Sequence, residues 1–87
     1  MRAGLKAISA RYDDQLGEVV VRLSSGLGIL ISPAVTQGLA NASEADLSEI
    51  EITPSGQGLH WPRLDADVYL PALLRGSTGS EAWIAAH

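Results

Sequence analysis

Hydrophobic and polar residues alternate along the first third of the chain, which is the pattern of β-strands with one buried face. In residues 5–12, one predicted face carries Ile8, Ala10 and Tyr12. Residues 17–26 contain three consecutive valines, whose β-branched side chains favour an extended backbone. A Ser-Ser-Gly turn then precedes the apolar segment 27–31. Residues 1–31 are therefore predicted to form a three-stranded antiparallel meander.

The pattern becomes helical at Pro33. Residues 32–47 are rich in alanine, and their apolar positions have roughly helical spacing, interrupted by one glycine. Ser32 and Pro33 fit a helix N-cap followed by proline at the first helical position. Ser43 begins a second capping pattern, with Asp46 in place of the usual glutamate. Two short helical pieces are predicted here.

Residues 48–61 predict a hairpin. Alternating isoleucines and glutamates lead into the turn sequence Pro-Ser-Gly-Gln-Gly, and a short apolar segment leads out. Pro62 ends the pairing because proline has no backbone N–H. The turn glycines, Gly56 and Gly58, are both expected to have positive φ angles.

The last part of the chain carries three weaker patterns. Residues 68–70 predict a brief strand, and residues 71–75 predict a helical turn after a proline. Residues 80–87 predict a last helical turn capped by Ser80, or else a frayed terminus.

The predicted fold class is therefore α+β. It consists of a small antiparallel sheet, made of the N-terminal meander and a C-terminal hairpin, with two or three short helices. A chain of 87 residues fits one domain. Its expected parts are the meander at 1–31, the helical segment at 32–47, the hairpin and motif at 48–76, and the C-terminal tail at 77–87.

Composition excludes several classes of protein. The chain has no cysteine, so disulfides and thiolate chemistry are excluded. No apolar segment reaches the roughly 18 residues of a membrane span, and the first residues lack a signal-peptide core, so we expect a cytoplasmic protein. The net charge of −4 disfavours nucleic acid, although Arg2, Lys6 and Arg11 could gather near the N-terminus.

Three residues after the hairpin turn, His60, Asp65 and Asp67, are candidates for metal binding or acid–base chemistry. A calcium loop would need further oxygen ligands, and Asp65 can instead serve a turn. The serines lie mostly in turns or at caps, and no glycine-flanked nucleophile elbow is present. We therefore expect no enzymatic activity and no cofactor.

Two features indicate protein binding, and each has a structural alternative. Trp61 is either a core residue or an exposed aromatic contact, and the absence of phenylalanine favours the core. An acidic run could face a basic partner or could simply be solvated. It consists of Glu44, Asp46, Glu49 and Glu51.

The segment 52–68, ITPSGQGLHWPRLDADV, resembles the signature of a bacterial family known as domain of unknown function 2442. The matching positions are Pro54, Gly56, Gly58, Trp61, Pro62, Leu64, Asp65 and Asp67. The sequences LLRG, ending at Gly76, and GSEAW, at 79–83, match as well. The resemblance implies a small α+β domain with an antiparallel sheet and no established enzymatic activity. It also implies a gene arrangement similar to that of toxin–antitoxin pairs.

The expected function is a non-enzymatic protein-interaction module, in the form of an antitoxin-like partner of a basic, toxin-like neighbour. Two alternatives stay open: a metal-binding domain or metal-dependent enzyme, and a DNA-associated regulatory dimer. A homodimer is favoured because a small meander leaves an edge strand unpaired. The candidate interaction or motif residues are Gly56, Gly58, His60, Trp61, Pro62, Asp65 and Asp67.

Overall fold

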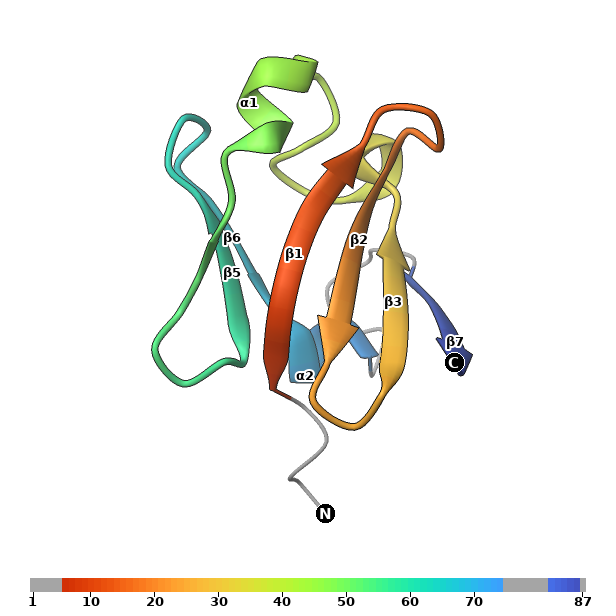
Figure 1. Ribbon diagram of the computed structural model, residues 1–87. Coiled ribbons are helices and arrows are strands. Elements are labelled where there is room, and N and C mark those ends of the chain that lie inside the picture. Colours follow the sequence, from red (N-terminus) through yellow and green to blue (C-terminus); the bar gives the residue numbers. More distant parts are fainter. Residues whose placement is uncertain (1–5, 75–81, 87) are drawn as a thin grey trace.

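Two antiparallel sheets face each other across a shared core in the computed structural model, which describes residues 6–74 and 82–86 (Figure 1). The first sheet has the order β1–β2–β3–β7, with β1 at Ala7–Asp13, β2 at Glu18–Leu23, β3 at Leu27–Ile31 and β7 at Ala82–Ala86. The second has the order β4–β5–β6, with β4 at Glu51–Ile52, β5 at Gly58–Trp61 and β6 at Ala66–Tyr69. The α+β class, the meander and the hairpin are confirmed.

The helical pieces are short and lie between the strands. They are the 3₁₀ turn η2 at Pro33–Val35, α1 at Glu44–Ser48 and α2 at Leu70–Leu74. The Ser43 hydroxyl accepts the backbone N–H of Asp46 at 3.1 Å, which confirms the second predicted cap. Ser32 precedes Pro33 as predicted, but its side chain caps nothing. Its carbonyl accepts the Thr36 hydroxyl instead, at 2.6 Å.

The first strand contains a β-bulge that the alternation does not predict. The β1–β2 register shifts between Ala7 and Ser9, so one extra residue, Ile8, is accommodated there. Ile8 is 64% exposed, whereas Ala7 is buried and Ala10 packs against the core. The prediction that Ile8 shares a face with Ala10 and Tyr12 is therefore wrong, because the bulge changes the phase of the alternation.

The predicted helical turn at residues 80–87 is also wrong. Ala82–Ala86 forms β7, which pairs antiparallel with β3 from Leu27↔Ala86 to Ile31↔Ala82. The unpaired edge of β3 offers the segment a full row of backbone hydrogen bonds, and this outweighs the weak helical preference of an isolated turn. Ser80 lies outside the described residues.

The strands around the motif are placed close to their predicted positions. The strand before the hairpin is reduced to Glu51–Ile52 because α1 extends to Ser48. The brief strand predicted at 68–70 is β6, and it extends the hairpin into a three-stranded sheet. Among the described strands, β6 pairs only with β5, and homodimerisation through such an edge stays a prediction.

The core lies between the two sheets. Both sheets contribute fully buried side chains to it. Those from the first sheet are Val19, Val21, Ile29 and Ile31, and those from the second are Leu59 and Trp61. Figure 1 shows β5 and β6 on one side and β1, β2 and β3 on the other. Each sheet therefore has one face that is turned away from this core.

Gly56 joins the hairpin turn to the first sheet. Its φ is +78°, as predicted, and its carbonyl accepts the N–H of Ala7 at 2.7 Å. A Cβ at this position would lie 3.1 Å from Cβ of Lys6, so the turn and the start of β1 are close together. Only a residue without a side chain satisfies both the backbone angle and this approach.

Gly58 is required for a different reason from the predicted one, since its φ is not positive. A Cβ there would lie 2.9 Å from Cγ2 of Thr53. The two residues are paired twice: Thr53 N–H donates to the Gly58 carbonyl, and Gly58 N–H donates to the Thr53 hydroxyl, each at 3.0 Å. The close contact across the turn excludes a side chain.

Substituting Gly56 should test the contact between the sheets, with Gly17 as the control. Gly17 also has a positive φ, +68°, but a Cβ there would meet nothing within 4 Å. Gly17→Ala should therefore show the backbone cost alone, about 1–2 kcal/mol. Gly56→Ala should lose about 1 kcal/mol more in urea unfolding, because the added methyl group displaces Lys6 and weakens the Ala7 bond. Equal losses would contradict a stabilising role for this contact.

Candidate functional site

A row of three polar side chains crosses the outer face of the second sheet. Glu51, His60 and Asp67 are consecutive register partners on β4, β5 and β6. Their strand neighbours Leu59 and Val68 are buried on the opposite face. Because side chains alternate along a strand, the row points away from the core. With Asp65 in the following turn it makes up the His60 cluster: Glu51, His60, Asp65 and Asp67.

His60 and Asp67 form the closest pair in this cluster. His60 Nδ1 lies 2.8 Å from Oδ1 of Asp67. Leu70 N–H donates to the Gln57 carbonyl, and bonded pairs alternate along an antiparallel ladder. His60 and Asp67 are therefore a non-hydrogen-bonded pair, the class whose side chains come closer together. This geometry explains why the imidazole contacts the carboxylate on β6.

The electrostatics of the cluster favour the charged imidazole. The hydrogen bond to Asp67 raises the pKa of His60 above its ordinary value, and the negative charges of Asp67, Glu51 and Asp65 raise it further, against the opposing effect of partial burial. The His60 side chain is 31% exposed and that of Asp67 is 73% exposed. The site is therefore a surface on which the Asp67 carboxylate contacts one ionisable imidazole and the charges of Glu51 and Asp65 act on it from farther away.

Asp65 has a conformational role in addition to its charge. It ends the four-residue loop 62–65 with a φ of +50°, in the left-handed region that aspartate tolerates better than most residues. The N–H of Leu64 donates to the Trp61 carbonyl at 3.1 Å within the same loop. Pro62, which is exposed, begins this loop, and β5 ends directly before it as predicted.

The metal hypothesis gains no support from this arrangement. The structure brings His60 and Asp67 into contact, but Asp65 affects His60 only through its charge. Within residues 6–74 and 82–86, no group of three His, Asp or Glu side chains is arranged to hold a metal ion. The metal-binding alternative stays a prediction.

Trp61 belongs to the core. It is fully buried, and its indole Nε1–H donates to the carbonyl of Leu47 at 3.2 Å. This bond ties β5 to the end of α1 and satisfies the polar atom of the ring. The exposed aromatic residue of the second sheet is Tyr69, which is 53% exposed and is the register partner of Gly58.

The acidic run is partly neutralised by an arginine that lies far from it in sequence. Arg63 Nε lies 2.9 Å from Oδ1 of Asp46, and its Nη1 lies 3.8 Å from Oε1 of Glu49. The hydrogen bond from Arg63 lowers the pKa of Asp46 below its usual value, and Ser43 adds to this effect. Among the described residues, no Lys or Arg is paired with the carboxylates of the His60 cluster, Glu51, Asp65 and Asp67.

Of the three N-terminal cations in the DNA hypothesis, which stays a prediction, the structure describes Lys6 and Arg11. Arg2 lies outside the described residues. Arg11 Nη1 is paired with Oδ2 of Asp13 at 3.1 Å, and the Cβ and Cγ atoms of Lys6 lie beside Gly56. None of the described helices is long and apolar enough to cross a membrane.

Two site residues were missed at the level of sequence. Glu51 was assigned to the acidic run, yet the turn that pairs Thr53 with Gly58 also sets Glu51 opposite His60. Counting outward from the turn could have revealed this. The position of Tyr69 beside the cluster depends on the β5–β6 register. The loop that sets this register contains no glycine, so the sequence lacks a glycine signal for this turn.

Removing the Asp67 carboxylate should lower the pKa of His60. The ordinary pKa of histidine, about 6.5, applies to His60 in the unfolded chain, and folding raises it. Protonation of His60 therefore stabilises the fold fully below about pH 6.5, and this stabilisation is lost as the pH rises through the folded-state pKa. We therefore expect Asp67→Asn to lower the His60 pKa in an NMR titration and to reduce this pH-dependent part of the thermal stability, because the charges of Glu51 and Asp65 remain. Asp14→Asn, in the exposed β1–β2 turn, is the control. An unchanged His60 pKa in Asp67→Asn would contradict the hydrogen bond.

Trp61→Phe should lower the free energy of unfolding by about 2–4 kcal/mol, measured by urea denaturation. The substitution leaves the buried Leu47 carbonyl without its donor and opens space in the core. Tyr69→Phe, at an exposed aromatic position, should change it by less than about 0.5 kcal/mol. Similar values for the two variants would disprove the structural role of the indole.

Comparison with known proteins agrees with the sequence motif and names no activity. The chain is similar to a protein of unknown function from Rhodospirillum rubrum, whose crystal structure shares 41% identity and a TM-score of 0.80, over 87% of this chain and 92% of that one. It is also similar to an uncharacterized protein from Chromobacterium violaceum, whose solution NMR structure shares 35% identity and a TM-score of 0.76, over 86% of this chain and 69% of that one. No curated protein matches the chain. The sequence profile of the proteins of unknown function DUF2442 matches residues 7–79, and the chain therefore belongs to this family.

Proposed function

We propose that the protein is a non-enzymatic interaction module that binds a basic partner protein through the outer face of its second sheet. The observation that carries the proposal is the His60 cluster, in which three carboxylates accompany a single imidazole on the outer face of the sheet, Asp67 in contact with it and Glu51 beside it in register. Charge of one sign on a rigid surface steers a partner of the opposite sign and sets its orientation.

The positions of the side chains favour docking. Glu51 and Asp67 extend from neighbouring strands on either side of His60, so their spacing is fixed by the sheet. The exposed ring of Tyr69 lies on the same strand and the same face as Asp67, and tyrosine is enriched at protein interfaces. Lysine or arginine side chains of a partner can pair with the two carboxylates while an apolar residue packs against the ring.

The exposure of the cluster argues for binding in preference to catalysis. Catalytic electrostatics depend on a preorganised site that excludes water from the reacting groups. Asp67 is instead largely exposed and His60 is partly exposed, which suits a surface that is covered only when a partner binds.

We further propose that the partner is the product of a neighbouring gene, with this chain as the antitoxin-like half of the pair. The support is the resemblance to the family's gene arrangement together with the excess of acidic residues, ten against six basic ones. The absence of cysteine fits a pair that acts in a reducing cytoplasm.

The double variant Glu51→Gln/Asp67→Asn should test the binding face. Co-expression with the neighbouring gene product, followed by calorimetry, should give a complex whose Kd increases about tenfold in the double variant and rises with salt. Asp14→Asn removes an exposed carboxylate from the first sheet's turn and should leave the Kd unchanged.

Two results would count against the proposal. A complex that is equally tight in the double variant would place the interface elsewhere. Failure to form any complex, with no rescue of the neighbour's toxicity, would contradict the antitoxin-like role.

A further inference from the structure

The outer face of the first sheet carries charged and apolar side chains in a fixed order along β2. Glu18, Val20 and Arg22 occupy alternate positions of this strand. Val19 and Val21, which lie between them, are fully buried in the core on the opposite face. The outer face therefore has an acid at one end of β2, an apolar residue at its centre and a base at the other end.

The neighbouring strand β3 continues this order. Leu30 is the register partner of Val20, and both side chains are only partly buried. Gly28 is the register partner of Arg22, so the surface beside this arginine is backbone without a side chain. The centre of the face is thus apolar across two strands, where a solvated antiparallel sheet is usually polar.

The charges at the two ends of the face lack partners of opposite sign. Among the described residues, neither Glu18 nor Arg22 takes part in an ion pair. Oε1 of Glu18 is buried and accepts no hydrogen bond within the described part of the chain. Asp13, the register partner of Glu18, is already paired with Arg11. One end of the face therefore keeps an unpaired negative charge and the other end an unpaired positive charge.

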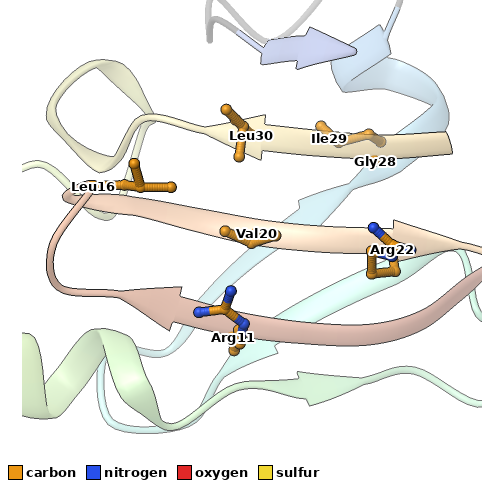
Figure 2. A pocket seen from close by; sticks show the side chains of 7 residues that line it. All are labelled: Arg11, Leu16, Val20, Arg22, Gly28, Ile29 and Leu30. Atoms are coloured by element: carbon orange, nitrogen blue, oxygen red, sulfur yellow. The ribbon is translucent and has the colours of Figure 1, made fainter. Parts of the chain in front are cut away.

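A hollow of about 190 Å³ lies over the apolar centre of this face (Figure 2). Leu16, which is 57% exposed, lies at one end of the hollow, and Gly28 and Arg22 lie at the other end. Pockets for cofactors and drug-sized molecules begin at about 300 Å³. The smaller hollow fits an apolar side chain of a protein, and Leu16 is a side chain of this kind beside it.

We propose that this face binds a second copy of the chain, with the two outer faces stacked and their β2 strands antiparallel. A two-fold axis that crosses the strands at Val20 places Glu18 of each copy opposite Arg22 of the other. The same axis brings Leu16 of each copy over Gly28 of the other, at the open end of its hollow. Each contact occurs twice, so the face is complementary to itself.

The size of the face indicates a weak dimer. The outer faces of β1, β2 and β3 cover roughly 15 by 17 Å, since strands lie about 4.8 Å apart and rise about 3.3 Å per residue. This is less than the ~800 Å² per partner that a stable complex buries, so we expect a Kd of about 0.1 mM. The His60 cluster lies on the other sheet, so the dimer leaves it uncovered in both copies.

Sedimentation equilibrium and ¹⁵N NMR of the full chain test for this dimer. From about 0.02 to 1 mM, a range that includes the expected Kd, the mean mass should rise from that of the monomer toward that of the dimer. The amide signals of Val20, Gly28 and Leu30 should shift over the same range. Leu16→Ala should raise the Kd at least about tenfold with an unchanged fold, because Leu16 is exposed in the single chain and its contact is lost twice.

Charge reversal tests the antiparallel arrangement. Glu18→Lys and Arg22→Glu should each raise the Kd at least about tenfold, because each variant sets like charges opposite each other. The double variant Glu18→Lys/Arg22→Glu restores the opposite charges and should return the Kd to within about threefold of the wild-type value. An equimolar mixture of the two single variants should form a mixed dimer for the same reason. Glu44→Lys, at an exposed position of α1, is the control and should leave the Kd unchanged.

Four outcomes would overturn the proposal. The first is a chain that stays monomeric at about 1 mM, ten times the expected Kd. The second is a dimer that Leu16→Ala leaves equally tight, and the third is a double variant that recovers none of the affinity lost in the single variants. The fourth is a set of shifts confined to β6, which would assign the dimer to pairing of sheet edges instead.

Discussion

The close pairing of Thr53 with Gly58 is the constraint on which the second sheet depends. The two residues exchange hydrogen bonds across the hairpin turn. A Cβ added at Gly58 would lie only 2.9 Å from Cγ2 of Thr53. This pairing sets the register that places Glu51 opposite His60. A slip of one residue would turn every side chain of β5 to the other face, exposing Trp61 and burying His60. Core and surface are therefore specified by the same turn.

Most elements could be predicted because local signals specify them: the period of the apolar residues, capping side chains and proline. The valines of β2, the cap at Ser43 and the end of β5 before Pro62 are of this kind. The bulge at Ile8 could not be predicted in this way, since the start of β1 also bonds to the distant Gly56. Residues 82–86 likewise became a strand because β3 had a free edge, which no local propensity encodes.

The candidate site shows the same division between local and distant causes. The glycine turn and Asp65 could be recognised as structural residues from the sequence, and His60 and Asp67 as polar residues on a short strand. Their contact depends on the four-residue loop that aligns β5 with β6. The neutralisation of Asp46 depends on Arg63, which lies 17 residues away in the chain. Because of long-range pairings such as these, the charge on the folded surface cannot be read directly from the order of charged residues in the sequence.

The bulge in β1 has a consequence for how this strand-rich chain behaves beside its own copies. The four-stranded sheet ends at β1, and an exposed flat edge strand is a template for amyloid-like stacking. The extra residue at Ile8 bends this edge, and Lys6 and Arg11 add charge along it. The irregularity near the start of the strand, together with the Gly56 carbonyl that accepts the Ala7 N–H, is thus of the kind that hinders edge-to-edge pairing of sheets.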